Sequence, residues 1–374
     1  MWVRAWSLAR KLGFAELILA LGGSSTATGT RFEHPWSLRY WVHTEQVGPP
    51  SARGVRILIA AACLSGVLGL TACTASPPAP TGTATRTPSA TGDAVAALGQ
   101  SVTIAPGRTI WLECRGTGTP TVILESGIHD SSDAWITLAL VPPAVGPDVF
   151  TALAAVTRVC RYDRPGTILV ADEPSLTERS SAVPMPRTIV EAASDLDALI
   201  EAADLEPPFL LVGHSFGGFL QTYFAQTHPE DVAGLVLVDA FSAAIPGLFG
   251  EGWDAYERVL NGGPEPLASD PAFERWDITG SVKLAQAAPA LREDLPVVVI
   301  SKTEPFALPP DMEGFTSEQL ERVWQGGQSS LAAMVPGTPH ILAEGSDHLI
   351  QAREPDLVAQ AVVLTMQRIR GEAR

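Results

Sequence analysis

The chain has 374 residues, 46% of them hydrophobic and 18% charged, so most of it is expected to fold around a sizeable core. Its formal net charge of −16 argues against nucleic acid as a partner, because few basic groups are available to neutralise phosphates. The four cysteines are too few for a disulfide-built scaffold, and their spacing is not that of zinc ligands.

The N-terminal part of the chain is predicted to hold an upstream extension and an export signal rather than folded structure. Residues 1–54 show no sustained periodicity and are interpreted as an upstream extension ahead of the true start. Arg53 and Arg56 then precede an apolar run from Ile57 to Leu70 that is too short for a comfortable membrane span. We therefore predict that residues 55–73 are a secretory signal.

The signal ends in Leu70-Thr71-Ala72-Cys73, which resembles the bacterial lipobox. The resemblance implies that Cys73 is diacylated and becomes the mature N-terminus, so that the protein is exported and held at a membrane surface. An ordinary signal or a buried helix with an incidental cysteine is the alternative. Residues 74–97 are rich in Pro, Thr and Ala and are predicted to be a flexible tether.

The folded domain is expected to cover residues 98–374. A helical pattern covers 188–203, between two groups of apolar segments that are typical of strands. The expected strands are 101–104, 109–114, 121–125, 156–162, 209–212, 235–238, 297–301 and a last one at 341–343. This alternation predicts the α/β class, with a mostly parallel, doubly wound sheet.

Ser215 lies in the segment Gly213-His214-Ser215-Phe216-Gly217, between an apolar strand and an amphipathic helix. A serine on such a sharp turn needs small neighbours, and Gly213 and Gly217 supply them. Its hydroxyl would stand at a helix N-terminus, where backbone N–H groups favour developing negative charge. The pattern therefore predicts a nucleophile.

This strand, turn and helix resemble the nucleophile elbow of the α/β-hydrolase superfamily, and Tyr162-Asp163-Arg164-Pro165-Gly166 resembles the turn after the family's fourth strand. The resemblance covers about residues 98–374. It implies a serine hydrolase with an oxyanion hole made by the backbone N–H groups of Phe216 and Ile128. It also implies a helical lid, here residues 242–295, inserted after the sixth strand.

A serine nucleophile needs a histidine base and an acid, which follow it in this family's chain order. His348 stands on a loop after the last predicted strand, as the family's catalytic histidine does. For the acid, Asp239 at the end of a strand is preferred. Glu304 is the alternative acid, and Asp311 is a third position.

Aromatic residues and two cysteines complete the expectations. The lid carries five aromatic residues that either line an apolar substrate pocket or pack a small core of their own. These are Phe249, Trp253, Tyr256, Phe273 and Trp276. Cys114 and Cys160 lie on strands that are neighbours in the usual hydrolase sheet, so they form either a disulfide or two buried thiols.

The predicted function is hydrolysis of a carboxylic ester with a small, apolar acyl substrate, through Ser215, His348 and Asp239. Thioesterase or peptidase activity of the same fold is an alternative, and so is a non-catalytic lipoprotein that binds a hydrophobic ligand or partner. No charged anchor for an amine stands out in the sequence. No cofactor, metal site or nucleic-acid partner is expected. Apart from the acyl substrate, the expected partner is the membrane surface, bound through the lipid anchor.

Overall fold

The computed structural model describes residues 99–136, 146–169, 174–309, 312 and 314–371, and the backbone of a two-stranded antiparallel pair, β1 (Phe32–Glu33) and β2 (Arg39–Tyr40). The predicted signal 55–73, with Cys73, and the tether 74–97 lie outside the described residues. In the part that is described, no helix is long and apolar enough to cross a membrane.

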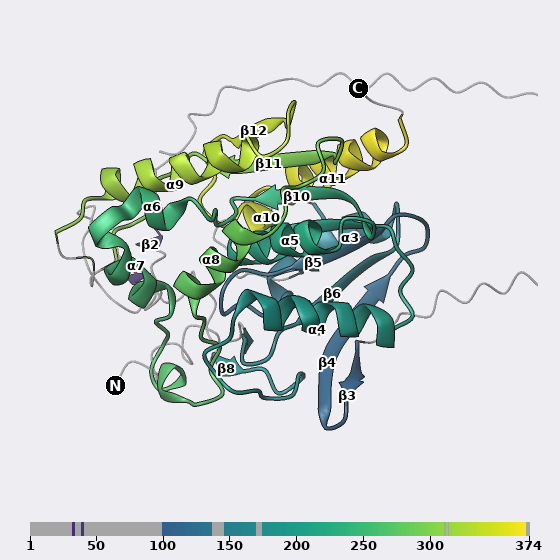
Figure 1. Ribbon diagram of the computed structural model, residues 1–374, viewed down its shortest axis with the longest axis horizontal. Helices are drawn as coiled ribbons and strands as arrows, with labels where there is room; N and C mark the ends of the chain where they lie inside the picture. The colour runs from purple at the N-terminus through teal and green to yellow at the C-terminus, as the bar shows by residue number, and fades with distance from the viewer. Residues whose placement is uncertain are drawn as a thin grey trace, which may run out of the picture. The chain divides into compact units, whose positions relative to one another are not determined.

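An eight-stranded sheet forms the centre of the domain, in the order β12-β11-β10-β9-β5-β6-β4-β3 (Figure 1). The six strands from β12 to β6 run parallel, while β4 and β3 pair antiparallel at one edge. The bounds are β3 (Gln100–Ala105), β4 (Arg108–Arg115), β5 (Thr121–Glu125), β6 (Val159–Asp163), β9 (Phe209–His214), β10 (Val232–Val238), β11 (Val297–Lys302) and β12 (His340–Ala343). The predicted mostly parallel α/β sheet is confirmed.

The parallel strands are apolar throughout because both faces of the sheet are covered. In β9, Phe209 and Leu211 join one core cluster, and Leu210 and Val212 join the cluster on the other face. The strand predicted at 156–162 begins later than expected. The N–H of Val156 and of Thr157 both donate to the carbonyl of Leu153, so these residues close the preceding helix and leave Val159 as the first strand residue.

Helices lie on both sides of the sheet (Figure 1). One core cluster contains side chains of α3 (Val149–Ala154) and α11 (Pro355–Ile369). The other contains side chains of α4 (Ile189–Ala202), α5 (Phe216–Thr227), α8 (Ile278–Ala287) and α9 (Ser317–Ala332). The remaining short elements are η1 (Ser132–Trp135), β7 (Ile168–Leu169), β8 (Ser175–Leu176), α6 (Ile245–Phe249), η2 (Gly250–Gly252), α7 (Trp253–Leu260), η3 (Leu267–Ser269) and α10 (Ile350–Arg353).

The helix predicted at 188–203 is α4, and its first turn shows why it starts where it does. The side chain of Thr188 accepts a hydrogen bond from the N–H of Glu191, whose carboxylate accepts one from the N–H of Thr188. This reciprocal cap satisfies two N–H groups that would otherwise have no partner at the helix end.

The two cysteines of the domain face each other across the antiparallel edge. Cys114 of β4 and Cys160 of β6 are register partners, and their sulfur atoms form a disulfide. The bond joins residues 46 positions apart in the sequence, so it closes a loop that contains β5, η1 and α3. Of the two alternatives for this pair, the structure has the disulfide.

Candidate active site

Ser215 occupies the turn between β9 and α5. Its backbone angles are φ 52° and ψ −124°, outside the regions that a serine normally adopts. The turn can be this tight because Gly217 has no side chain. A Cβ atom added there would lie 2.3 Å from the carbonyl oxygen of Ser126. The sharp turn leaves Ser215 at the N-terminus of α5, where the helix dipole favours negative charge.

Asp239 and His348 are joined by a hydrogen bond. Nδ1 of His348 donates to Oδ2 of Asp239 at 2.6 Å, and the backbone N–H of Lys302 donates to Oδ1 at 3.2 Å. Asp239 is fully buried directly after β10, with a φ of 41°. Because Nδ1 of His348 carries the proton that Asp239 accepts, Nε2 of the neutral ring is left as a base.

His214 and the strand ends bring these two residues to Ser215. Nε2 of His214, the residue before Ser215, lies 2.9 Å from the carbonyl oxygen of His348, and the two rings are 4.6 Å apart. The N–H of Ser215 donates to the carbonyl of Val238, the residue before Asp239, at 3.1 Å. The three residues therefore gather at the carboxyl edge of the parallel strands.

The alternative acids, and the other two histidines that follow Ser215 in the chain, do not meet at this point. Glu304 is exposed, and in the described structure no contact joins its carboxylate to His348. Asp311 lies outside the described residues. His340 contacts Ser301 through Nε2 at 2.7 Å, and His228 lies at the end of α5 beside Thr227.

The loop after β5 runs beside the nucleophile. A Cβ atom added to Gly127 would lie 3.3 Å from Cβ of Ser215, so the loop backbone passes directly alongside it. Ile128 follows on this loop, and Phe216 is the first residue of α5. The structure thus brings together the two segments whose N–H groups were predicted to form the oxyanion hole.

Arg164 holds the backbone of this loop. Nη1 donates to the carbonyl of Ser126 at 2.9 Å, and Nη2 donates to the carbonyl of Gly127 at 2.6 Å. The guanidinium also contacts Glu125 at the end of β5 and Glu274 in the insertion 242–295, with 2.7 Å between Nε and Glu274 Oε1. All of these groups are buried, so the loop is held by interactions that water does not screen.

Glu274 links the insertion to the same loop. Its Oε2 accepts a hydrogen bond from the N–H of His129 at 2.6 Å. The ring of His129 in turn lies 2.8 Å from the carbonyl of Leu260 in α7 and stacks on Phe273 at 4.5 Å. The φ of His129 is 66°, in the left-handed region that few non-glycine residues adopt, and these contacts hold the backbone in that conformation.

Arg164 lies between two buried carboxylates, Glu274 and Glu125, whose pKa values are shifted in opposite directions. Burial opposes ionisation of Glu274, but Arg164 outweighs it and the pKa of Glu274 is lowered. Burial raises the pKa of Glu125 to about 7, in spite of Arg164. Near neutral pH, Glu274 is therefore the ionised partner of Arg164, and Glu125 is protonated in a large fraction of the molecules.

Sequence reasoning missed two of these groups. Arg164 belongs to the turn that sequence analysis singled out, although its contacts did not follow from it. Glu274 lies 110 positions from Arg164, in a stretch with no motif of its own.

The insertion 242–295 is helical, and its aromatic residues are part of the core. Tyr256 and Phe249 stack at 4.4 Å, and Trp276 lies 4.7 Å from Phe216. Trp253 and Phe273 are also buried. The packing thus supports the alternative in which these aromatics form core, while Trp276 joins the insertion to the residue after the nucleophile.

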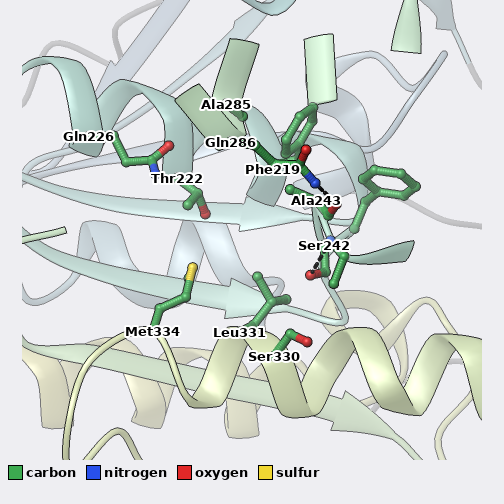
Figure 2. Close-up of a pocket in the computed structure, with 12 residues that line it drawn as sticks. Phe219, Thr222, Gln226, Ser242, Ala243, Ala285, Gln286, Ser330, Leu331 and Met334 are labelled. Carbon is green, nitrogen blue, oxygen red and sulfur yellow. Dashed lines mark hydrogen bonds between the residues drawn. The ribbon is translucent and has the colours of Figure 1, made fainter. Parts of the chain in front are cut away.

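An apolar cavity of about 270 Å³ lies between α5, α8 and α9 (Figure 2). Phe219 and Phe241 line it and both pack on Phe216, at 5.4 and 5.8 Å. Ser215, Asp239 and His348 do not line this cavity, so it is separate from the candidate site. Within the described parts of the chain, no group of three His, Cys, Asp or Glu side chains could hold a metal ion.

Comparison with known proteins gives the family context. The model of the family described as "alpha/beta hydrolase fold" matches residues 120–279. YqjL of Bacillus subtilis, an uncharacterized protein, is 25% identical over 258 residues, which cover 66% of this chain and 84% of YqjL. The protein C23C11.06c of Schizosaccharomyces pombe is also 25% identical, over 71% of this chain but 57% of its own length.

Among solved structures, carboxylesterase CesB of Bacillus subtilis is similar, with 18% sequence identity and a TM-score of 0.42. The match covers 72% of this chain and 91% of CesB. It is a likeness of fold. Together with the sheet order and the turn at Ser215, the family match identifies the architecture of the chain.

Proposed function

We propose, from the premise that this chain has the α/β-hydrolase fold, that it is a serine hydrolase with Ser215 as nucleophile, His348 as base and Asp239 as acid. The observation that carries the proposal is the 2.6 Å hydrogen bond between His348 Nδ1 and the buried Asp239, tied through His214 to the turn of Ser215. This is the arrangement that activates a serine hydroxyl.

In the proposed reaction, Nε2 of His348 takes the proton of Ser215 as its oxygen attacks a substrate carbonyl carbon. The N–H groups of Phe216 and Ile128 stabilise the oxyanion that forms. His348 then gives the proton to the leaving group, and the acyl-enzyme results. Water attacks the acyl carbon with His348 again as base, which releases the acid and restores Ser215.

A carboxylic ester is the substrate class that we propose. Apolar rings flank His348: Phe306 at 5.1 Å and Trp324 at 5.3 Å between ring centroids. Such surroundings suit a group without charge on the side of the site that these rings cover. Thioesters, lactones and small amides react by the same steps and are the alternatives within the mechanism.

A fluorophosphonate tests the proposal without a choice of substrate. We expect the purified protein to gain the mass of one adduct, at Ser215, and the Ser215→Ala variant to gain none. A serine that is not activated reacts very slowly with this reagent, so the difference reports the base. A folded wild-type protein that stays unlabelled would argue for a non-catalytic binding protein instead.

We further propose that the protein is an exported lipoprotein, anchored through Cys73. The support is the sequence of residues 55–73, with its basic start, apolar run and lipobox-like end. The N-terminal peptide of the protein isolated from its native host is then expected to start at Cys73 and to carry acyl chains. Peptides that contain Trp2 or Trp6 in that mature protein would contradict the assignment.

A further inference from the structure

The candidate base, His348, stands at the end of a short loop that begins where β12 ends. The parallel ladder between β11 and β12 pairs Lys302 with Ala343 and stops there. Thr303, the next residue, continues the connection with its side chain. Its Oγ1 donates a hydrogen bond to the carbonyl of Ala343 at 3.2 Å and accepts one from the N–H of Gly345 at 2.7 Å. One hydroxyl group therefore bridges two points of the loop that leads to His348.

Backbone contacts of the same segment fix the loop one residue further on. The N–H groups of Thr303 and Glu304 both donate to the carbonyl of Ser346, at 3.2 and 3.0 Å, and the N–H of Ser346 donates to the carbonyl of Ala343 at 3.1 Å. Gly345, with a φ of 78°, supplies the left-handed turn that brings these groups together. The loop is thus held against the segment after β11 as well as by its own turn.

The end of β11 also holds the candidate acid. The N–H of Lys302 donates to Oδ1 of Asp239 at 3.2 Å, and Oδ2 of Asp239 accepts the hydrogen bond from Nδ1 of His348 at 2.6 Å. Thr303 follows Lys302 directly, so its hydroxyl links the loop of the base to the backbone group that holds the acid. A shift of the loop relative to Thr303 therefore moves the imidazole relative to Asp239 and Ser215.

The chain after His348 is held by other groups. The N–H of Leu349 donates to Oδ1 of Asp347 at 3.0 Å, and Oδ2 of Asp347 accepts from Nε and Nη2 of Arg353 in α10 at 3.0 and 2.9 Å. These contacts anchor the loop on the far side of the base. Loss of the Thr303 hydroxyl would therefore loosen the near side of the loop and leave the far side in place.

We propose that Thr303 is a positioning residue, whose hydroxyl group holds the loop so that Nε2 of His348 faces the hydroxyl of Ser215. This inference rests on the proposed hydrolase function and deepens it. A general base must lie within hydrogen-bond reach of the proton that it takes. A misplacement of about 1 Å can lower the rate by about 10²-fold. Both hydrogen bonds of the Thr303 hydroxyl go to the loop backbone, so it acts on the reaction through His348.

The hydroxyl is expected to matter more for the rate than for stability. Its bond with the N–H of Gly345 is exposed, and the carbonyl of Ala343 also accepts from the N–H of Ser346. Without the hydroxyl of Thr303, water can bond to the N–H of Gly345, and Ala343 keeps a partner. The midpoint of urea unfolding should therefore change little.

The test removes the hydroxyl in two ways. Thr303→Val keeps the size and the branched Cβ, and Thr303→Ala removes the hydroxyl without placing a methyl group against the loop. Both variants are expected to lose about 10- to 100-fold in kcat for 4-nitrophenyl butyrate, with KM within about twofold of the wild type. The rate of fluorophosphonate labelling should fall by the same factor. Thr303→Ser retains the hydroxyl and should restore both rates to within about threefold of the wild type.

Thr338→Val is the matched control. Thr338 lies in the turn that leads into β12, and its Oγ1 donates to the carbonyl of Val335 at 2.8 Å. This variant loses the same kind of hydrogen bond at the other end of the strand from the loop of His348. It is expected to keep the wild-type kcat and labelling rate, and urea unfolding shows whether each variant is folded.

Several results would overturn the inference and leave the hydrolase proposal standing. These are wild-type rates in Thr303→Val and Thr303→Ala, a slow rate in the valine variant alone, no recovery in Thr303→Ser, a loss that appears in KM, or an equal loss in Thr338→Val. Hydroxyl-free variants that do not fold would assign the hydroxyl to stability, which also overturns it. If the wild type is not labelled at Ser215, the proposed function fails and this inference fails with it.

Discussion

Replacing Asp239 by asparagine is expected to lower kcat by about 10⁴-fold, the effect of the same change in a serine triad. Asp239 accepts two hydrogen bonds, one on each oxygen, from His348 Nδ1 and from the N–H of Lys302. Asparagine has one oxygen for these two donors. If its amide NH₂ faces His348, the ring must carry its proton on Nε2, and it can no longer accept the proton of Ser215.

The matched variant is Glu304→Gln, which alters the alternative acid. Glu304 is exposed, so this change is expected to leave both kcat and stability close to the wild type. Steady-state kinetics on a 4-nitrophenyl ester and the rate of fluorophosphonate labelling should agree for each variant. A value of kcat for Asp239→Asn within tenfold of the wild type, with a large loss in Glu304→Gln, would reverse the assignment.

The sequence predicts those parts of the site that depend on local backbone. The turn at Ser215 could be predicted because a strand, two glycines at defined offsets and a helix are all encoded within one short segment. The strands at 121–125 and 209–212 could be predicted because buried parallel strands are uninterrupted apolar runs. The alternation of strands and helices predicted a mostly parallel sheet, but the order of its strands is known only from the structure.

The choice of acid was less predictable, because it depends on how three strand ends meet in space. Asp239 reaches His348 because β10, β11 and β12 are adjacent in the sheet and the N–H of Lys302 holds its second oxygen. Glu304 is two residues beyond Lys302, yet its side chain is exposed. The direction of a side chain just after a strand depends on the path of the backbone there. The amino-acid types in the segment do not reveal that path.

Contacts between distant segments left no pattern in the sequence. The guanidinium of Arg164 and the carboxylate of Glu274 meet across 110 positions, and Glu274 stands in a helical insertion whose path over the sheet cannot be derived from periodicity. The aromatic residues of that insertion illustrate the same limit. An aromatic residue looks the same in the sequence whether its ring lines a pocket or packs in the core. In the structure, Trp276 contacts Phe216 and is buried.

Arg164→Lys is expected to reduce kcat by up to about 10²- to 10³-fold, the effect of losing one donor of an oxyanion hole. Lysine keeps the charge but has no planar fork, so it cannot bond to the carbonyls of Ser126 and Gly127 and to Glu274 at once. The loop beside Ser215 would then relax and misplace the N–H of Ile128. The loss should appear in kcat rather than in KM, because the contact with the oxyanion is made in the transition state.

Arg161→Lys is the matched control for buried charge. Arg161 lies on β6, three residues before Arg164, and its guanidinium pairs with Glu113 and Asp133, away from the carbonyls of Ser126 and Gly127. Both lysine variants are expected to unfold more easily in urea, since each loses part of a buried ion pair. Only Arg164→Lys should show a lower kcat for the folded protein, so equal kcat values in the two variants would mean that Arg164 acts through stability alone.

The Glu274→Gln variant tests whether Arg164 and Glu274 act together in holding the loop after β5. Glutamine retains an oxygen that can accept the N–H of His129 but loses the charge that pairs with Arg164. If Arg164 and Glu274 hold the loop as one unit, the double variant Arg164→Lys, Glu274→Gln should lose no more kcat than the worse single variant. Losses in kcat that multiply would instead mean that each residue acts on the loop by itself, with the insertion holding His129 independently of the strand end.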